Sequence, residues 1–356
     1  MKTKTSSHPA IRAFSPILLG AALLFVPAVT SSAAELVKAD NTTDLGAAGA
    51  WTDGTAVITG TSSDVLVFDD TLQTNSTFTW TSGNRTARGL RLENPANDIR
   101  ITISNNSTHT IGADGIDMAN ATKSLTLIGT NQAFGFIRFS QATNNIIVGS
   151  GASLNIQTQI TTSSTGTLNF TGAGDINING TNGTIRNNGA NFTAVTHAGT
   201  GTLTLANANT YTGGTTLTSG NFTLAGTGSL LFDLAKGNQV TGNTTGDVRF
   251  DGVFNVAVGD VPFTGDTAWT LVAGTFGDLV YGSGFSLSLT GSVVGSGITL
   301  DSSNHYTAGN WSYDTATGAL SFAAVPEPGA TAAFAGAAML LAGALLRRRV
   351  CRRRSA

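Results

Sequence analysis

Short apolar runs of strand length recur through this 356-residue chain and constrain its fold more than any other feature. In runs such as 99–103 and 124–128, apolar residues alternate with Thr, Ser or Arg, as in a strand with one buried face. Gly, Asn, Asp or Ser flank these runs and favour turns. The i, i+3, i+4 pattern of an amphipathic helix is nearly absent between residues 35 and 324. The sequence therefore predicts an all-β body.

The spacing of these runs indicates how the strands are arranged. Ile101, Leu125, Ile146 and Leu168 follow one another at intervals of roughly 20 to 24 residues, and a similar interval precedes Phe222. Such a period predicts stacked coils, each of which pairs with its neighbours and buries aliphatic ladders along one axis. A β-sandwich, or several small β-domains, is the competing architecture because its turn spacing overlaps with this one. We expect a parallel β-solenoid.

The first 34 residues have the organisation of a secretory signal peptide. Lys2, Lys4 and Arg12 precede a short apolar core, and small residues occupy positions 32–34, as signal peptidase requires. The core of about ten residues is too short to span the roughly 30 Å of hydrocarbon in a bilayer. We expect residues 1–34 to be removed by signal peptidase between Ala34 and Glu35.

The last 33 residues form a tail of three parts. Pro326, Glu327 and Pro328 come first, and the prolines cannot continue a helix or a central strand. The uncharged apolar run 329–346 follows, close to the minimum length for a membrane-spanning helix. The arginine-rich segment 347–354 ends the tail, and such a cluster stays on the cytoplasmic side. The tail predicts a single C-terminal transmembrane helix.

This tail resembles the PEP-CTERM sorting signal, and Pro326, Glu327 and Pro328 match its motif. The resemblance implies recognition by an exosortase-type sorting enzyme while the C-terminal helix anchors the chain in the inner membrane. It further implies transfer to the outer surface or the extracellular matrix, often in bacteria that make extracellular polysaccharide. The signal is an address and leaves the activity of the exported body open.

Between its terminal segments the chain is acidic. The body holds 10 of the 19 Lys and Arg residues and 20 of the 21 Asp and Glu residues, so its net charge is about −10. Nucleic acid is therefore not an expected partner, because its phosphates require clustered Lys and Arg. The single cysteine, Cys351, lies in the tail, and the four histidines are isolated. We predict no disulfide in the body and no metal or cofactor site.

The sharpest internal repeat covers residues 199–230. Its three segments, 199–205, 209–217 and 219–224, resemble the autotransporter-associated β-strand repeat, and residues 165–172 resemble a degraded copy of its start. The resemblance implies a right-handed parallel β-helix of the kind displayed at cell surfaces. After Trp311 the chain continues into the sorting tail instead of an autotransporter translocation domain, so self-export is not implied.

These features divide the chain into five expected parts. They are the signal peptide (1–34), an N-terminal β cap (35–98), the β-helix repeats (99–246), a C-terminal β cap (247–323) and the sorting signal (324–356). The segment 247–323 is rich in aromatic residues, and a solenoid needs an atypical end to cover its open core. A small separate β-domain is the alternative for this segment. We expect its aromatic side chains to form core rather than a platform for sugars.

Acidic pairs are the candidates for catalysis. Asp69 and Asp70 are adjacent, so on a strand they would point to opposite faces. Asp114 and Asp117 flank Gly115, and aspartate is a common turn residue. We predict no catalytic residue from these pairs. The arginines at positions 85, 88 and 91 are expected to form a solvated face.

Two functional classes follow from the sequence. We expect an exported, non-enzymatic surface or matrix protein with a structural or adhesive role, for which extracellular polysaccharide is a candidate partner. The alternative is a β-helix polysaccharide lyase or hydrolase. That activity requires two acids and a base that are distant in sequence but aligned in one cleft.

Overall fold

The computed structural model describes residues 34–54, 58–59, 63–80, 83–104, 107–130, 135–259, 263, 265–291, 297–324 and 339. The chain divides into two units, 1–32 and 33–356, and all the described residues belong to the second. The expected signal peptide up to residue 33, the motif Pro326, Glu327 and Pro328, and the basic segment 347–354 lie outside the described residues. So does the expected transmembrane segment 329–346, apart from Met339. In the described part, no helix is both long and apolar enough to cross a membrane.

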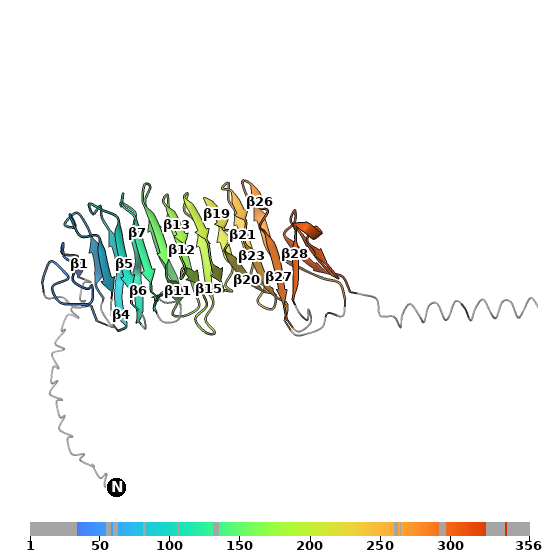
Figure 1. The fold of residues 1–356 in the computed structure, drawn as a ribbon, viewed down its shortest axis with the longest axis horizontal. Coiled ribbons are helices and arrows are strands. Elements are labelled where there is room, and N and C mark those ends of the chain that lie inside the picture. The colour runs from blue at the N-terminus through green and yellow to red at the C-terminus, as the bar shows by residue number, and fades with distance from the viewer. Residues whose placement is uncertain are drawn as a thin grey trace, which may run out of the picture. The chain divides into compact units, whose positions relative to one another are not determined.

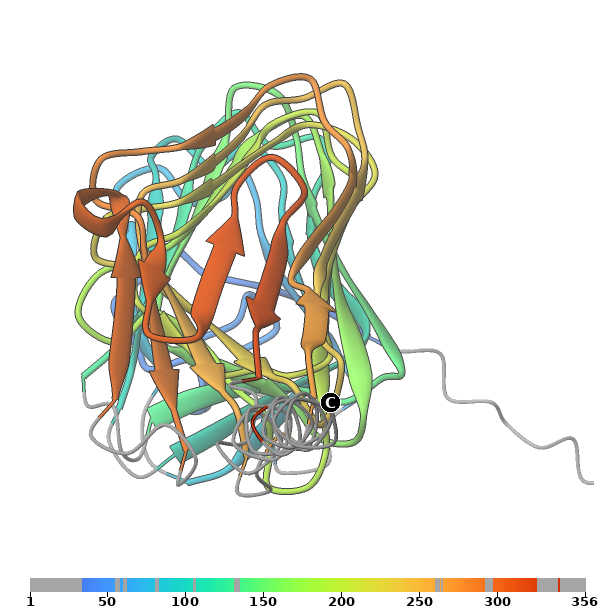
Figure 2. The ribbon, with the colours of Figure 1, turned by 90° about the vertical axis from the view of Figure 1, so that its right-hand side faces the viewer.

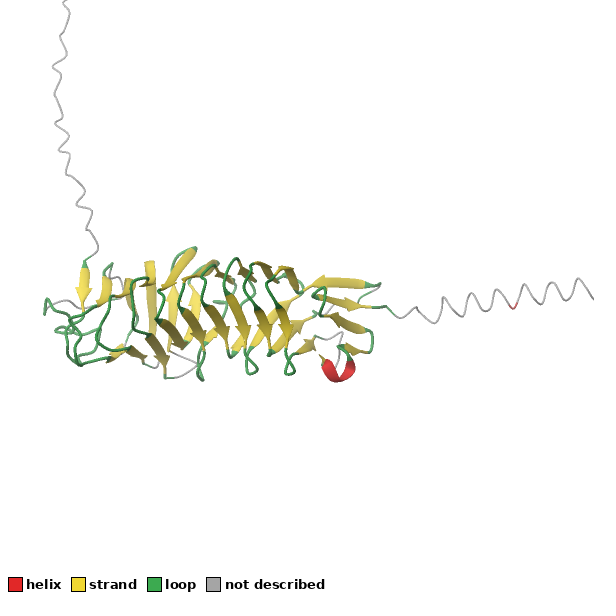
Figure 3. Cartoon of the chain, turned by 90° about the horizontal axis from the view of Figure 1, so that it is seen from above, coloured by secondary structure: helices red, strands yellow, loops and turns green. Residues whose placement is uncertain are grey.

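The described body is all-β and forms a parallel β-solenoid of about eight turns with almost no helix (Figures 1 and 3). Its largest sheet has 13 strands among the described residues. The main path of this sheet is β1 (Glu35–Val37), β2 (Val65–Phe68), β4 (Arg85–Leu92), β6 (Ser107–Met118), β9 (Thr143–Val148), β12 (Gly166–Gly172), β15 (Thr193–His197), β18 (Thr215–Leu217), β21 (Val240–Asn243) and β25 (Val272–Thr275). Neighbouring strands on this path pair in parallel.

A second parallel sheet forms another side of each coil. Within the described ranges it contains nine strands: β3 (Thr77–Trp80), β5 (Ile99–Ile103), β7 (Leu125–Gly129), β10 (Ser153–Gln157), β13 (Asp175–Ile178), β16 (Thr202–Leu205), β19 (Asn221–Leu224), β22 (Val248–Phe250) and β26 (Leu279–Tyr281). Hydrogen-bonded positions on adjacent coils are 22, 26, 27 or 29 residues apart. Coil length therefore varies while the strand register is maintained.

The third side of the coils is built from shorter pieces. Its strands are β8 (Gly135–Phe139), β11 (Gln159–Thr162), β14 (Thr184–Ile185), β17 (Ala208–Asn209), β20 (Ser229–Asp233), β23 (Val253–Ala257) and β27 (Ser286–Thr290). The first three branch from β6, and a parallel bridge between Arg186 and Thr210 leads on to β17. Seen along the stack, the strands of successive coils superimpose around a common interior (Figure 2).

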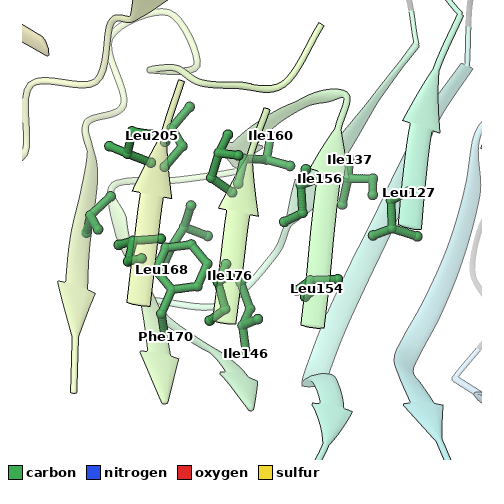
Figure 4. Packing of buried hydrophobic residues seen from close by; sticks show 14 of the residues in the cluster. Leu127, Ile137, Ile146, Leu154, Ile156, Ile160, Leu168, Phe170, Ile176 and Leu205 are labelled. Atoms are coloured by element: carbon green, nitrogen blue, oxygen red, sulfur yellow. The ribbon is translucent and has the colours of Figure 1, made fainter. Parts of the chain in front are cut away.

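The interior is filled by ladders of apolar side chains that repeat from coil to coil (Figure 4). One ladder in the nine-stranded sheet runs through Ile101, Leu127, Ile156, Ile178, Leu205, Leu224 and Phe250, all fully buried. Each such side chain contributes roughly 1.5–3 kcal/mol by leaving water. The alternation seen in the sequence is thus the inward and outward alternation of these strands, and the predicted parallel solenoid is confirmed.

The pairing corrects one detail of the predicted repeat. Ile101 pairs with Leu127, and Leu125 pairs with Ile99 and Leu154. Ile146 lies in β9 of the 13-stranded sheet. The interval of about 20 to 24 residues therefore mixed two sides of the coil, because every side has the same strand alternation and the sequence does not label the side.

Parallel pairing also extends beyond the predicted repeat segment 99–246. It begins with Glu35 opposite Val65 and continues to Thr290 opposite Ala257. Both predicted caps therefore contain regular coils. The covering structures are shorter pieces at the two ends.

A compact turn covers the N-terminal end of the stack. Trp51 bridges Lys38 antiparallel, and Thr52 donates a backbone hydrogen bond to Val37, so the outer edge of β1 is covered. The ammonium of Lys38 is fully buried and donates to the carbonyls of Ala39 and Asn41 and to the Asn41 side chain, at 2.8, 3.0 and 2.9 Å. Three donors meet three acceptors, which compensates for burying the charge.

An antiparallel sheet covers the C-terminal end. Its strands are β24 (Thr267–Thr270), β31 (Ala319–Phe322), β30 (Trp311–Asp314) and β29 (Thr307–Ala308), and β28 (Ile298–Asp301) pairs antiparallel with β27. A short 3-10 helix, η2 (Ser302–Asn304), links β28 to this sheet (Figure 3). Trp311 and Tyr313 are each only 4% exposed. They pack against other rings, including Phe263 and Phe254, so these aromatics are core.

Two histidines take positions inside the coils. His197 follows Phe170 in the ladder of the 13-stranded sheet and hydrogen-bonds through Nε2 to the Gly201 carbonyl at 3.0 Å. His109 stacks on Trp80 with ring centroids 4.3 Å apart, and its Nε2 lies 3.2 Å from the Trp80 carbonyl. Burial lowers the pKa of His109 to about 4 and also lowers the pKa of His197. Both side chains are therefore neutral in the folded protein at neutral pH.

This burial predicts acid sensitivity. The unfolded chain takes up a proton on His109 near pH 6.5, whereas the folded protein does so only near pH 4. The stabilisation is therefore complete above about pH 6.5 and declines by about 3 kcal/mol as the pH falls to about 4. Urea unfolding of the protein at pH 7, 5.5 and 4.5 should show this loss. His109→Gln keeps a neutral donor and should flatten the profile; an unchanged profile in this variant would assign the loss to other groups.

Candidate functional surface

The outer side of the nine-stranded sheet carries a row of uncharged polar side chains. Strand register aligns Arg100, Thr126, Asn155, Asn177, Thr204, Thr223 and Arg249 across seven consecutive strands. All are at least partly exposed. The Asn177 amide donates to Asn155 Oδ1 at 3.2 Å, so amides on adjacent coils bond to each other as well as facing solvent.

The outer side of the 13-stranded sheet has a similar row. Asn145, Asn169, Thr196, Thr216 and Thr241 are in register on five consecutive strands. Asn169 donates to Asn145 at 3.0 Å, and Thr241 lies 3.4 Å from Thr216 Oγ1. Hydroxyls and amides both donate and accept hydrogen bonds. These rows therefore offer neutral contact sites at a spacing of about 4.8 Å, the distance between strands.

Sequence reasoning missed these rows as surfaces. The Thr and Asn residues were recognised only as the polar half of each alternating strand. Their alignment depends on which strands are neighbours, and Asn145 and Asn169 come from strands whose partners the sequence did not identify. The signal that could have found them is the repeated Thr or Asn at alternate positions of successive strands.

The predicted cleavage site lies at the first strand. Glu35 begins β1, and its carboxylate lies 2.7 Å from the guanidinium of Arg91. The Ala34 carbonyl accepts a hydrogen bond from the Val65 amide at 3.0 Å, and the Ala34 amide donates to Asp64 at 3.3 Å. Ala34 and Glu35 therefore mark the start of the ordered β ladder. These contacts do not test where the leader is cut.

The aspartates considered for catalysis are occupied by local bonds. Asp69 accepts from the Thr71 amide and hydroxyl at 3.0 and 2.7 Å, which is a turn contact. Asp114 pairs with Arg88 at 3.0 Å. Asp117 accepts from the Ala119 amide at 3.0 Å. The structure does not gather these carboxylates into one cleft.

The arginines of β4 also differ from a simple solvated face. Arg88 pairs with Asp114, and Arg91 lies 2.7 Å from Glu35 and 2.8 Å from Glu93. The ion pairs join positions on β1, β4 and β6, three adjacent coils. They are partly exposed, so each adds little to stability.

The surface hollows of the described part are shallow and poor in acids. Three open hollows have volumes of about 320, 300 and 240 Å³. The first contains Asp266 as its single carboxylate, the second contains Asp175, and the third contains Lys236 and no carboxylate. Hydrolysis of a glycosidic bond by two carboxylates needs both in one site, and none of these hollows provides that. Among the described residues, no group of three His, Cys, Asp or Glu side chains could hold a metal ion.

Comparison with known proteins adds no relative: no family model, no curated protein and no solved structure matches this chain.

Proposed function

We propose that this chain is an exported, non-catalytic β-solenoid that serves as a structural or adhesive component of the cell surface or extracellular matrix. The observation that carries the proposal is the pair of outer rows, in which Asn and Thr side chains repeat from coil to coil with few charges. A surface of this kind presents many equivalent weak contacts rather than one pocket. Multiple weak contacts suit adhesion to an extended partner.

The stack supports the structural part of this role. Each coil contacts its neighbours through parallel hydrogen bonds and buried ladders, and covering segments close both ends. Such a body needs no disulfide, which agrees with the absence of cysteine before position 351. The resemblance of residues 199–230 to autotransporter-associated repeats supports a right-handed coil.

Delivery rests on the two terminal segments. In this proposal residues 1–34 direct export and are removed by signal peptidase. The motif Pro326, Glu327 and Pro328, the apolar run 329–346 and the arginine-rich segment 347–354 then anchor the chain in the inner membrane for an exosortase-type enzyme. The β body afterwards reaches the outer surface or the matrix.

The experiment that tests the proposal compares binding with turnover. The exported protein, purified from the culture of its host, is incubated with extracellular polysaccharide from the same culture. We expect the protein to sediment with the polymer while the amount of new reducing ends and of unsaturated sugar ends stays at background. Time-dependent release of either kind of end would overturn the non-catalytic role in favour of a hydrolase or a lyase.

Mass spectrometry of the same sample tests the delivery route. The proposal expects a chain that begins at Glu35. A surface-released form that still carries the segment 347–354 would contradict the sorting assignment.

A further inference from the structure

Charge is unevenly distributed along the acidic body. Between residues 118 and 232 the only acidic residue is Asp175, whereas this stretch contains Lys123, Arg138 and Arg186. The acids are thus concentrated toward the two ends of the stack. The central coils carry a small positive excess within a body of about −10.

Two of these cations are aligned on the third side of the coils. Arg138 in β8 is opposite Thr161 in β11, and the pairing of β11 with β14 places Thr161 opposite Arg186. Arg186 in turn bridges to Thr210. We name Arg138, Thr161 and Arg186 the arginine row. Its two guanidinium groups belong to positions two coils apart, or about 9–10 Å along the stack at the usual strand spacing.

Both arginines are on the outer side of the sheet. Their neighbours Ile137, Ile160 and Ile185 are fully buried in the core, so alternation directs the arginines outward. Both side chains are partly exposed. The row is therefore accessible from solvent.

These guanidinium groups have no carboxylate partner in the described part of the chain, unlike Arg88, Arg91 and Arg249, which form ion pairs. The Nε atoms of Arg138 and Arg186 are buried and make no hydrogen bond there. A partly desolvated cation without an anion is unfavourable. Binding of an anion would therefore compensate each guanidinium.

The strand position next to the row adds an apolar surface. Phe136, two positions before Arg138, is partly exposed on the same outer side, and its ring centre lies 5.3 Å from the Arg138 guanidinium. In register with it, Gln159 presents an amide. A ring beside a cation can contact the apolar face of a sugar while the cation binds its carboxylate.

We propose that the arginine row binds an acidic polysaccharide that carries a carboxylate on every second sugar and lies along the stack. A β-linked sugar advances by about one strand spacing, so alternate carboxylates would meet alternate coils, where Arg138 and Arg186 lie. Each guanidinium can hold a carboxylate with two parallel hydrogen bonds. The proposal names the partner class for the matrix role above and rests on that proposed function.

The charge of the body favours this polymer over nucleic acid. Duplex DNA carries a charge about every 1.7 Å, which two arginines cannot neutralise and which the remaining acidic surface would repel. A carboxylate about every 10 Å places one anion at each arginine and leaves the intervening neutral sugar against Thr161. Charge density therefore distinguishes the two polyanions.

The test uses the full-length exported protein and hyaluronan oligosaccharides, in which carboxylate-bearing and neutral sugars alternate. Affinity is measured by calorimetry for the unmodified protein, for Arg138→Gln, for Arg186→Gln and for the double variant. Each single substitution is expected to weaken binding about tenfold, as for loss of one charge-assisted contact. Arg100→Gln, which removes an outward arginine from the nine-stranded sheet, is the matched control and should bind as the unmodified protein does.

Three outcomes would overturn the proposal. They are unchanged affinity in the double variant, equal affinity for neutral chitin oligosaccharides, and tighter binding of a DNA duplex at the same salt concentration. Circular dichroism of each variant identifies any loss of binding that comes from misfolding, and Arg138→Lys, which keeps the charge, should retain intermediate affinity. Cleavage of the oligosaccharide would refute the non-catalytic function and leave the arginine row intact, whereas absence of binding would refute only the row.

Discussion

Replacing Phe254 by alanine is expected to lower the free energy of unfolding by about 3–5 kcal/mol. Phe254 is fully buried, and its ring lies 4.7, 5.0 and 4.9 Å from those of Phe232, Phe250 and Phe285. It joins the last coils to the C-terminal cap through Tyr313. The cavity left by the ring would be lined by other aromatics that cannot all move inward.

The control is Phe136→Ala, which removes a phenylalanine from the outer side of β8 and should cost less than about 1 kcal/mol. Because a solenoid is stabilised by neighbouring coils, the Phe254 variant should unfold locally. Hydrogen exchange should then increase in β22, β23 and β27 before it increases in β5 and β7. Equal losses in the two variants, or a uniform increase in exchange, would contradict the role given to this cluster.

Replacing Gly172 by alanine is expected to cost at least about 3 kcal/mol, because two penalties combine. Gly172 ends β12 with φ +95°, a conformation that other residues avoid. A Cβ at this position would lie 2.0 Å from the carbonyl oxygen of Val148 on the adjacent coil. The separation between coils is set by hydrogen bonds, so the chain cannot easily make room for a methyl group.

Gly151→Ala is the matched control for this substitution. Gly151 also has a positive φ, +86°, but an added Cβ would meet no atom within 4 Å. It should lose only the conformational part, about 1 kcal/mol. Thermal and urea unfolding of both variants measures the difference, and similar losses would mean that close packing between coils contributes nothing at Gly172.

The local character of the strands could be predicted from the sequence. Alternation in Ile99, Ile101 and Ile103 predicted a strand with one buried face, and these three residues are buried. Turn residues between such runs and the recurring interval predicted a parallel solenoid. These predictions depend on a period of two residues and on turn chemistry, both of which are local properties of the chain.

The candidate surfaces could not be predicted in the same way. The sequence indicated that no acidic pair was arranged for catalysis, and the structure places Asp69, Asp114 and Asp117 in local contacts. It did not indicate the outer Asn and Thr rows, because coil lengths vary and adjacent positions are 22 to 29 residues apart. A fixed spacing in the sequence therefore cannot identify the residues of one row.

The sequence by itself determined that the body is built from short, one-sided strands, because hydrophobic alternation is local. Only the tertiary structure decided which strands are neighbours, and with that the alignment of Arg138 and Arg186 two coils apart. It also decided that Ile146 belongs to a different sheet from Leu125. The reason is physical: every side of a coil buries apolar residues in the same way, so strand pairing is selected by how the turns close each coil and by the fit of the whole interior.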